Sequence, residues 1–553
     1  MHLRATLNRA AGVNSHKWQD QPVQKVFICT LMYKYIHEKV QSCPGDAAGL
    51  DLAVSRTAPR TPTGYTFGHG RGGLVPVTLN VPIPAADPYT LFSALGIDEG
   101  FLLESMEGMP RRAVRSIIGL EPALVLSMDG ELSCTGRPGL ADFLGEVTGS
   151  PVAQLREIAG RLSCRGVPGH TFLGGLVGYC TYDMVTGLTN GMVQAGRKKG
   201  PLARFMLSTR GVVYNHVSGA CLLYDDLVLL PGDDPDEERA KARERLGSLS
   251  ARIQEIAPGP EDHGPAPGPA GENEEYSPAS TSVSRDEFME AVRRAKDHIR
   301  AGDIFQVVLS REVTCPCTGD PLAIYRAIRR INPSPYLYYL GFDDEAIIGS
   351  SPEMLVRVEE RKVQTVPIAG TRPRGKDPVE DARLAQDLLG DEKEKAEHLM
   401  LVDLARNDIG RVSAFGSVEV PEFMEVEQFS HVQHLVSRVS GVMAGDRDRF
   451  DALAACFPAG TVSGAPKIRA MQIIAELEPR PRGLYAGAVG YVGFNECLGF
   501  AIAIRTLRVS GGLAEFSTGA GIVADSVPER EWEETGHKAR AMVQAVAQGG
   551  RNP

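Results

Sequence analysis

The stretch that most limits how this chain can fold lies near its middle. It reads APGPEDHGPAPGPAGENEEYSPASTSVS over residues 257–284, and is dominated by proline, glycine, glutamate, alanine and serine. Such a stretch has too few large apolar side chains to bury a core, so it predicts a flexible linker. We therefore expect two folded parts, residues 76–256 and residues 285–548.

The overall composition excludes some classes of protein. The chain is 43% hydrophobic, with a formal net charge of −10 and a pI of about 5.7. Nucleic-acid binding needs a basic excess, which is lacking. No apolar run reaches the ~18 residues that span a bilayer, and the ten scattered cysteines fit reduced thiols. We expect a cytoplasmic protein with neither nucleic acid nor a membrane as partner.

Residues 1–75 differ from the rest of the chain. They carry nine lysines and arginines against four acids, a net charge of +5, which leaves −15 for the remainder. Their hydrophobic periodicity is weak, and no cleavage pattern of a targeting peptide is clear. We expect a poorly ordered extension, or a start codon placed too far upstream.

Residues 76–256 alternate short apolar runs with turns. Examples are ALVLSM, FLGGLVGY and ACLLYDDLVLL, which begin at Ala123, Phe172 and Ala220. Runs of this length and character predict strands with few helices.

The second part begins with a helix signal. Ser284 followed by Glu287 forms a capping box, and apolar residues then recur at helical spacing from Phe288 to Ile299. Further helices are predicted over residues 379–404 and 528–547, among strand-like runs such as IFQVVLS and GFAIAIRTLRV. The pattern predicts an α+β fold, in which helices flank large, mostly antiparallel sheets, with a β-rich N-terminal subdomain.

The predicted C-terminal helix places Glu531, Glu534 and Lys538 on one face. One interpretation is a solvated face with a Glu534–Lys538 ion pair. The other is that the two carboxylates hold a divalent cation, since Mg²⁺ takes one or two protein carboxylates.

Three more polar residues sit in apolar surroundings. Glu397 directly precedes the run HLMLV, where a carboxylate needs a cation or hydrogen bonds. Arg505 lies in AIAIRTLRV, predicted as an apolar strand, where a bound carboxylate would be a suitable partner. Gln306 interrupts the run IFQVV in the same way.

Two further motifs invite a ligand. In SHVQHLVSRV, period two places His431 and His434 on opposite strand faces, which argues against a shared metal and leaves His434 as a tuned imidazole. The loop TVPIAGTRPRGK gathers Arg372, Arg374 and Lys376 around two glycines, either to hold an anion or as a basic surface turn.

Longer matches then identify a family. NPSPY, GSSPE, PIAGTRPRG, AEHLMLVDLARND, HLVSRV, GTVSGAPK, GAVGY and GAGIVADSVPEREWEET resemble the chorismate-utilising enzymes, and within them the large, component I subunits of anthranilate synthase. The matches cover nearly all of the second part, and FLLESMEG and FLGGLVGY extend them into the first. The resemblance implies the α/β sandwich of that family.

The resemblance also implies an activity. Chorismate and ammonia would give anthranilate and pyruvate, with Mg²⁺ as cofactor, as the first committed step of tryptophan biosynthesis. Ammonia would come from a glutamine amidotransferase subunit, anthranilate synthase component II, in a heterotetramer.

Roles in the reaction follow from the matching positions. Glu397 and Glu534 would bind Mg²⁺, with Glu531 close by, and the metal would hold the ring carboxylate of chorismate. Glu353 would be the general acid that protonates the departing hydroxyl. His434 would assist at that hydroxyl and in the loss of pyruvate.

Substrate-binding roles follow in the same way. Arg505 and Tyr485 would hold the enolpyruvyl carboxylate. The other implied substrate contacts are Thr461, Gly349, Gly519, Ala520, Gly521 and Lys538.

Two positions discriminate among relatives. Ala369 stands where aminodeoxychorismate synthases typically have a nucleophilic lysine. Gln306, counted as catalytic, stands where isochorismate-forming relatives carry a lysine that activates water, so ammonia fits better as the nucleophile. The alternatives are an aminodeoxyisochorismate synthase, an aminodeoxychorismate synthase, and a non-enzymatic regulator that binds tryptophan or chorismate.

A regulatory site is implied as well. Ser105 and Arg115, together with the NPSPY segment, resemble a pocket for tryptophan as feedback inhibitor. The residues of that segment are Asn332, Pro333, Ser334, Pro335 and Tyr336.

Overall fold

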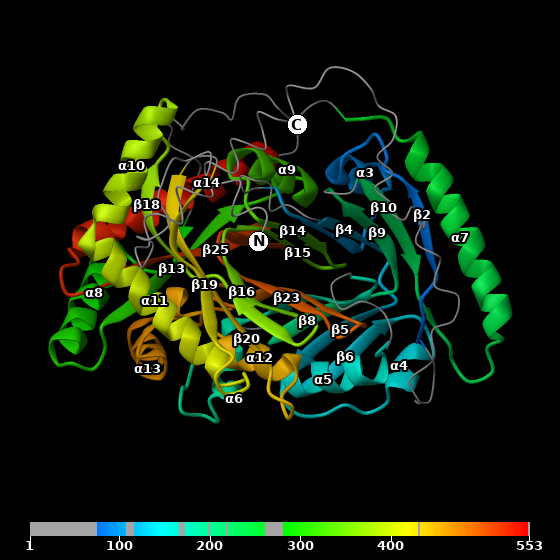
Figure 1. Ribbon diagram of the computed structural model, residues 1–553, viewed down its shortest axis with the longest axis horizontal. Helices are drawn as coiled ribbons and strands as arrows, with labels where there is room; N and C mark the ends of the chain where they lie inside the picture. The colour runs from blue at the N-terminus through cyan, green and yellow to red at the C-terminus, as the bar shows by residue number, and fades with distance from the viewer. Residues whose placement is uncertain are drawn as a thin grey trace, which may run out of the picture. The chain divides into compact units, whose positions relative to one another are not determined.

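Two large β-sheets stacked on each other, with helices on their outer faces, form the fold (Figure 1). The computed structural model describes residues 74–106, 115–164, 172–196, 200–216, 219–259, 280–429 and 432–550. These residues belong to one compact unit of the chain. The predicted α+β class with large antiparallel sheets is confirmed. The predictions for residues 1–73, for most of the linker and for His431 concern residues outside the described ones.

The first sheet has twelve strands. Eleven of these strands follow one path of neighbours. The twelfth, β21 (Gly464–Ala465), lies off this path and pairs with β13. The path runs through β12 (Ser280–Thr281), β13 (Gln306–Pro316), β25 (Leu513–Ile522), β24 (Thr506–Ser510), β15 (Ala346–Ser351), β14 (Tyr336–Gly341), β3 (Gly100–Glu104), β4 (Arg115–Leu120), β9 (Arg210–Asn215), β10 (Ala220–Asp225) and β2 (Thr78–Pro82).

The second sheet has eleven strands, and β19 (Glu419–Gln428) branches from β20. Its path runs through β18 (Ile368–Pro373), β20 (Val432–Val442), β17 (Lys362–Thr365), β16 (Met354–Glu359), β23 (Leu498–Ile502), β22 (Ala488–Gly493), β7 (Gly175–Cys180), β8 (Ala203–Ser208), β5 (Leu124–Asp129) and β6 (Glu131–Gly136). A small separate sheet pairs β1 (Leu74–Val75) with β11 (Leu227–Val228).

Both large sheets run through the two halves of the sequence. In the first sheet β14 pairs antiparallel with β3, so that Tyr339 lies opposite Leu102. In the second sheet β22 pairs antiparallel with β7, so that Gly490 lies opposite Gly178. Residues on either side of 257–284 therefore share one fold, and the division of the chain into domains at that segment stays a prediction.

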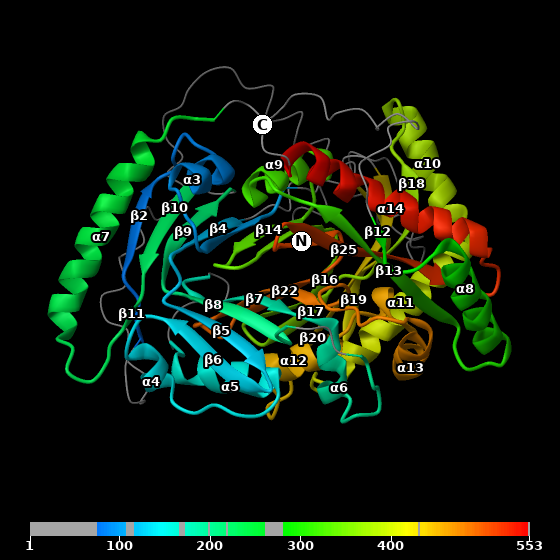
Figure 2. The same cartoon turned by 180° about the vertical axis from the view of Figure 1, so that it is seen from behind.

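The helices cover the outer faces of the sheets (Figure 2). Side chains of α3, α7, α9 and α14 join the core on the first sheet, and α5 and α12 contribute to the core on the second. The described helices are α3 (Pro88–Ala94), α4 (Leu140–Leu144), α5 (Pro151–Arg161), α6 (Val185–Leu188), α7 (Pro235–Glu255), α8 (Arg285–Arg300), α9 (Pro321–Ile331), α10 (Pro378–Gly390), α11 (Glu392–Gly410), α12 (Arg449–Cys456), α13 (Lys467–Leu477) and α14 (Pro528–Gly549), with short 3₁₀ turns η1 (Tyr182–Met184) and η2 (Gly460–Val462).

A third core lies between the two sheets. Ile117 and Ile347 reach into it from the first sheet, and Val177 and Val489 from the second. This inner core packs the two sheets against each other.

Local signals predicted some elements and missed others. The capping box of Ser284 and Glu287 is confirmed at the start of α8. The continuous helix predicted over residues 379–404 is wrong, because Asp391 has an extended backbone and caps a new helix, α11. The 21-residue helix α7 was not predicted within residues 76–256.

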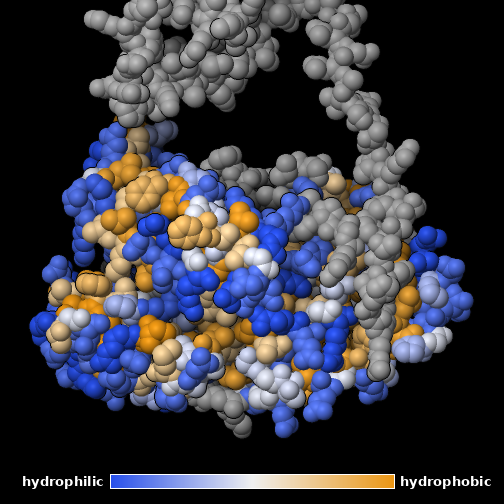
Figure 3. All heavy atoms as spheres, turned by 60° about the horizontal axis from the view of Figure 1, so that its bottom comes forward, coloured by the Kyte–Doolittle hydropathy of each residue, from blue (hydrophilic) through white to orange (hydrophobic). Residues whose placement is uncertain are grey.

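None of the helices in the described residues has the length and apolar character to cross a bilayer. On the face shown in Figure 3, hydrophilic side chains lie between the apolar ones.

Candidate active site

A cavity of about 770 Å³ lies where β13 and β25 meet α11 and α14. Most of the polar residues singled out in the sequence line it, although they come from segments far apart in the chain. The predicted site residues among its lining are Gln306, Glu353, Glu397, Thr461, Tyr485, Arg505, Gly519, Gly521, Glu531, Glu534 and Lys538.

One wall of the cavity is acidic. Glu397 comes from α11, whereas Glu531 and Glu534 come from α14. Burial raises the pKa of Glu397, and the charges of Glu394 and Glu534 raise it further. Burial also raises the pKa of Glu531, and Glu534 adds to the shift. These carboxylates therefore repel one another across the cavity.

The ion pair predicted as an alternative along α14 is present. Lys538 Nζ lies 2.7 Å from Glu534 Oε1 and donates to the carbonyl of Gly519 over 3.0 Å. Glu534 and Lys538 nevertheless both line the cavity, so their face of α14 is not simply a solvated surface.

The acidic wall suits a divalent cation. Within the described residues, no three His, Cys, Asp or Glu side chains are gathered closely enough to bind a metal by themselves. Mg²⁺ does not need such a cage, because it usually takes one or two protein carboxylates and completes its octahedron with water and substrate oxygens. Two or three carboxylates that repel one another across a cavity can therefore supply the protein ligands of such a cation.

Glu353 follows the end of β15, at the turn into β16, and is only 7% exposed. Its backbone N–H donates to Ser351 Oγ over 3.4 Å, and its carbonyl accepts from Ile502 N–H over 3.1 Å. Burial raises the pKa of its carboxyl to about 8, with the Thr461 side chain acting in the opposite direction. Glu353 is therefore protonated at neutral pH, the form that a general acid requires.

His434 stands just behind the cavity wall. Its Nδ1 lies 2.7 Å from the carbonyl of Gly370 and 3.2 Å from Thr371 Oγ1, and both of these residues line the cavity. Because a carbonyl can only accept, Nδ1 carries the proton and Nε2 keeps its lone pair. Burial lowers the pKa of His434, so the ring is neutral.

The prediction that Arg505 lies within an apolar strand is wrong. The strand is broken there, because the chain leaves β23 of one sheet at Ile502 and enters β24 of the other at Thr506. Arg505 has a φ of 50° in this crossing, an unfavourable value for a residue with a side chain. Its exposed guanidinium lines the cavity and donates to Asn332 Oδ1 over 3.3 Å. Such strain is common where a side chain must be aimed.

Tyr485 and the glycines of β25 are fitted to each other. A Cβ placed on Gly519 would lie 2.4 Å from the hydroxyl oxygen of Tyr485, so only glycine leaves room for that phenol. Burial raises the pKa of Tyr485 to about 12, which keeps it a hydrogen-bond donor. Thr461, in the η2 turn, lines the cavity near them.

Two predicted substrate contacts do not line this cavity. Gly349 lies in β15 against Tyr338, and a Cβ there would come within 2.3 Å of the tyrosine ring. Ala520 is fully buried in the core formed with α8 and α13, on the other face of β25 from Gly519 and Gly521.

The basic loop braces neighbouring acids. Arg372 pairs with Asp387 and Asp391, each over 2.8 Å, and so ties β18 to α10 and α11. Arg374 donates to both carboxylate oxygens of Asp381. Neither arginine lines the cavity, whereas Gly370 and Thr371 of β18 do.

A second cavity, of about 280 Å³, lies between the two sheets. Ser105, Arg115, Pro335 and Tyr336 of the predicted regulatory set line it, whereas Asn332, Pro333 and Ser334 do not. Its other charged lining residues are Glu104, Arg357 and Glu359, beside apolar and aromatic side chains such as Phe172, Met354 and Tyr491. Charges of both signs beside aromatic rings suit a zwitterion with an apolar side chain.

Sequence reasoning missed the buried pair of Glu478 and Arg482 behind the cavity wall. Arg482 Nη2 lies 2.7 Å from Glu478 Oε1, and their side chains are 2% and 8% exposed. The only local signal was their i, i+4 spacing, which is common on surfaces as well.

A buried acid and an acidic wall around one cavity, with a neutral imidazole behind its wall, are features typical of an enzyme site for a small anionic substrate. A family model described as chorismate binding enzyme matches residues 107–544. The chain belongs to this family.

Curated relatives place the chain more closely. It is 44% identical to anthranilate synthase component 1 of Methanothermobacter marburgensis, over 84% of this chain and 94% of the relative. The corresponding protein of Thermus thermophilus is 49% identical over 68% of this chain and 78% of the relative. Over most of both chains, this chain is therefore similar to anthranilate synthase component 1.

Solved structures of related enzymes share the fold of this chain. Anthranilate synthase component I from Streptococcus pneumoniae superposes with a TM-score of 0.65 at 37% identity, over 78% of this chain and 92% of that one. The isochorismate synthase MenF from Escherichia coli gives a TM-score of 0.64 at 21% identity, over 87% and 96%, which shows the shared fold alone.

Proposed function

We infer that the protein is an anthranilate synthase large subunit, which converts chorismate and ammonia to anthranilate, pyruvate and water. The observation that carries this proposal is the arrangement of a single cavity. The carboxylates of Glu397, Glu531 and Glu534 and the guanidinium of Arg505 line it together with the buried acid Glu353. A bound cation and a guanidinium together can match the two carboxylates of such a substrate.

Glu397 and Glu534 would hold Mg²⁺, with Glu531 close by. When bound, the cation neutralises these carboxylates and attracts a carboxylate of the substrate. Lys538, which pairs with Glu534 and donates to the carbonyl of Gly519, would add positive charge beside the substrate. Arg505 and Tyr485 would hold the second carboxylate of the substrate from the other side.

Glu353 would donate its proton to the hydroxyl that leaves chorismate as ammonia adds. A positioned acid contributes about 10²–10⁴-fold, and the buried site of Glu353 keeps the proton available at neutral pH. The unprotonated Nε2 of His434 would accept a proton during the later loss of pyruvate.

Gln306 would orient the nucleophile. Its Nε2 donates to Glu397 Oε1 over 3.4 Å, while its buried Oε1 has no hydrogen-bond partner within the described part of the chain. A free carbonyl oxygen beside the cavity can accept a hydrogen bond from ammonia. A glutamine cannot activate water as a lysine could, which supports amination over hydroxylation.

The partner would be a glutamine amidotransferase subunit that releases ammonia, in a cytoplasmic heterotetramer. The cavity lined by Ser105, Arg115, Pro335 and Tyr336 would bind tryptophan as feedback inhibitor. Its paired charges and aromatic lining support an amino acid as ligand.

The test is a product assay on the whole chain with chorismate, MgCl₂ and an ammonium salt at alkaline pH. The proposal predicts the fluorescence of anthranilate, which requires Mg²⁺ and is abolished by EDTA. Chorismate that stays unchanged under these conditions, in a folded preparation, would overturn it.

A further inference from the structure

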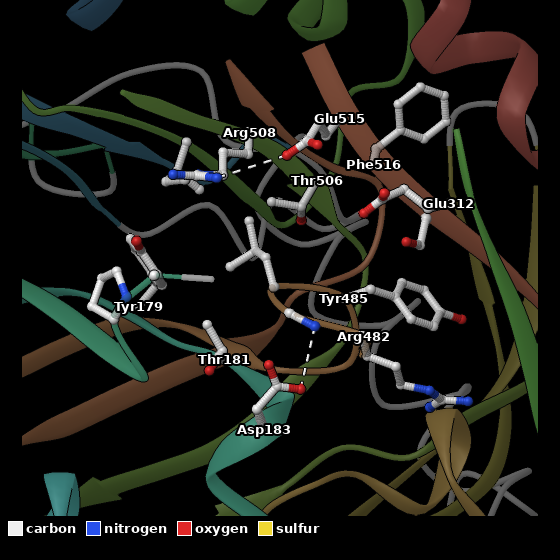
Figure 4. Close-up of a pocket in the computed structure, with 16 residues that line it drawn as sticks. Tyr179, Thr181, Asp183, Glu312, Arg482, Tyr485, Thr506, Arg508, Glu515 and Phe516 are labelled. Carbon is white, nitrogen blue, oxygen red and sulfur yellow. Dashed lines mark hydrogen bonds and ion pairs between the residues drawn. The ribbon is translucent and has the colours of Figure 1, made fainter. Parts of the chain in front are cut away.

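Arg482 is a buried guanidinium that the reaction does not use. It is 5% exposed and lies directly behind the cavity wall. Figure 4 shows Arg482 beside Tyr485, in a smaller cavity that also includes Asp183 and Glu312. The Arg482 guanidinium carbon lies 5.5 Å from the ring centre of Tyr485 and 4.9 Å from that of Tyr182.

Its hydrogen bonds reach two segments of the substrate cavity. Nη1 donates to the carbonyl of Val462 and Nη2 to the carbonyl of Val308, each over 2.7 Å. Val462 ends the η2 turn that carries Thr461, and Val308 belongs to β13, two residues from Gln306. Both valines line the cavity.

Glu478 completes the arrangement. It accepts from Arg482 Nε over 2.9 Å and from Nη2 over 2.7 Å, in a two-point pair. The same carboxylate accepts from Ser310 N–H over 2.8 Å and from Ser310 Oγ over 3.0 Å. The pair thus joins the end of α13, the η2 turn and β13 at one point.

We propose that Arg482, held by Glu478, is a positioning residue for substrate binding, which fixes the Thr461 turn, β13 and the Tyr485 ring relative to one another. Removing one member of such a buried pair leaves the other unpaired. A lysine cannot replace the arginine, since its single ammonium lacks the planar fork that reaches both carbonyls and the carboxylate together. The inference rests on the proposed function, because its readout is the affinity for chorismate.

The acidic wall gives the internal reference for a test. Glu397 and Glu534 come from α11 and α14, to which Arg482 makes no hydrogen bond among those the structure gives in the described residues. Loss of positioning should therefore affect chorismate more than Mg²⁺. A general loss of stability would instead weaken the binding of chorismate and of Mg²⁺ alike.

The experiment measures KM for chorismate and the half-saturating concentration of Mg²⁺ for the wild type and Arg482→Lys. We expect the KM for chorismate to rise about tenfold, as for lost hydrogen bonds to a charged group, while half-saturation by Mg²⁺ stays within about twofold. Arg449→Lys is the matched control. Arg449 is also a buried arginine that donates to two backbone carbonyls, those of Gly493 and Cys497, and it does not line the cavity.

Glu478→Gln is the second variant, for the case that Arg482→Lys does not fold. It should give the same split, because the guanidinium loses its charged partner. Arg449→Lys should leave both constants close to their wild-type values. A folded variant of Arg482 or Glu478 with wild-type KM, or one whose two constants change in parallel, would overturn the positioning role. A wild type that makes no anthranilate would instead overturn the proposed function.

Discussion

Arg505 Nη1 donates a hydrogen bond to Asn332 Oδ1 over 3.3 Å. Arg505 lines the proposed substrate cavity, and Asn332 begins the segment that ends in Pro335 and Tyr336 of the proposed tryptophan pocket. Ser350 adds two contacts, since its N–H donates to the carbonyl of Arg505 and its side chain is bound to the carbonyl of Asn332. The segment from Asn332 to Tyr336 therefore contacts a lining residue of the substrate cavity at one end and lines the second cavity at the other.

The first prediction concerns tryptophan. Arg115→Gln removes a positive charge from the smaller cavity, so the concentration of tryptophan that halves activity should rise about tenfold or more, as for a lost charged hydrogen bond. Initial rates over a tryptophan series measure it. Arg137→Gln, an exposed arginine in the same half of the chain, is the control. Equal inhibition of the wild type and both variants would show that Arg115 does not contribute to tryptophan binding.

The second prediction concerns the general acid. Glu353→Gln keeps the shape of the side chain but cannot release a proton, so kcat should fall about 10²–10⁴-fold. The KM for chorismate should change little, because the amide still fills the site. Steady-state kinetics measure both constants. A kcat within twofold of wild type would contradict the assignment.

The third prediction is the pH dependence that Glu353 imposes. Since its pKa in the folded protein is about 8, the protonated form is lost as pH rises through that value. The rate per free ammonia should fall about tenfold per pH unit above it.

The same carboxyl makes stability depend on pH. The folded protein holds this proton where the unfolded chain has already lost it. The contribution of Glu353 to the free energy of unfolding therefore declines as pH rises from the ordinary carboxyl range to about 8. Glu353→Gln should lose both effects.

The fourth prediction separates metal ligands from other acids. Glu397→Gln and Glu534→Gln should each raise the half-saturating concentration of Mg²⁺ at least about tenfold, because a neutral amide is a weaker ligand. Glu392→Gln is the control on α11, since Glu392 pairs with Lys395 and does not line the cavity. Magnesium titrations of activity measure the effect. Unchanged titration curves for both ligand variants would exclude the metal site.

The fifth prediction contrasts two glycines. Gly519→Ala forces a methyl group against the Tyr485 hydroxyl, so it should raise the KM for chorismate. Gly349→Ala instead places a methyl group against the ring of Tyr338, outside the cavity. Overpacking of this kind costs about 1–3 kcal/mol, so this variant should lose thermal stability. Calorimetry and steady-state kinetics on both variants give the comparison. A raised KM in Gly349→Ala alone would contradict the assignment of Gly519, and not Gly349, to the substrate cavity.

Much of the candidate site could be predicted because its signals are local. Glu397 stands at the edge of an apolar run, and Glu531 and Glu534 share a helix face that the sequence shows directly. The start of α8 was equally readable from Ser284 and Glu287. In each case a few neighbouring residues determine the local structure.

Long-range pairing explains what sequence reasoning missed. The strand of Arg505 is interrupted because the chain passes there from one sheet to the other, which no periodicity reveals. The two sheets join strands from both sides of residues 257–284, so the change in composition there does not separate one sheet from the other. Arg482 acquires its position through Val308, a residue far away in sequence.

The most direct test of the whole account is the stoichiometry of the products. Chorismate, Mg²⁺ and ammonium are incubated with the wild type, and anthranilate and pyruvate are quantified together by mass spectrometry and enzymatic assay. The account predicts one anthranilate and one pyruvate for each chorismate consumed. An aminated product that retains the enolpyruvyl group, with no pyruvate released, would contradict it.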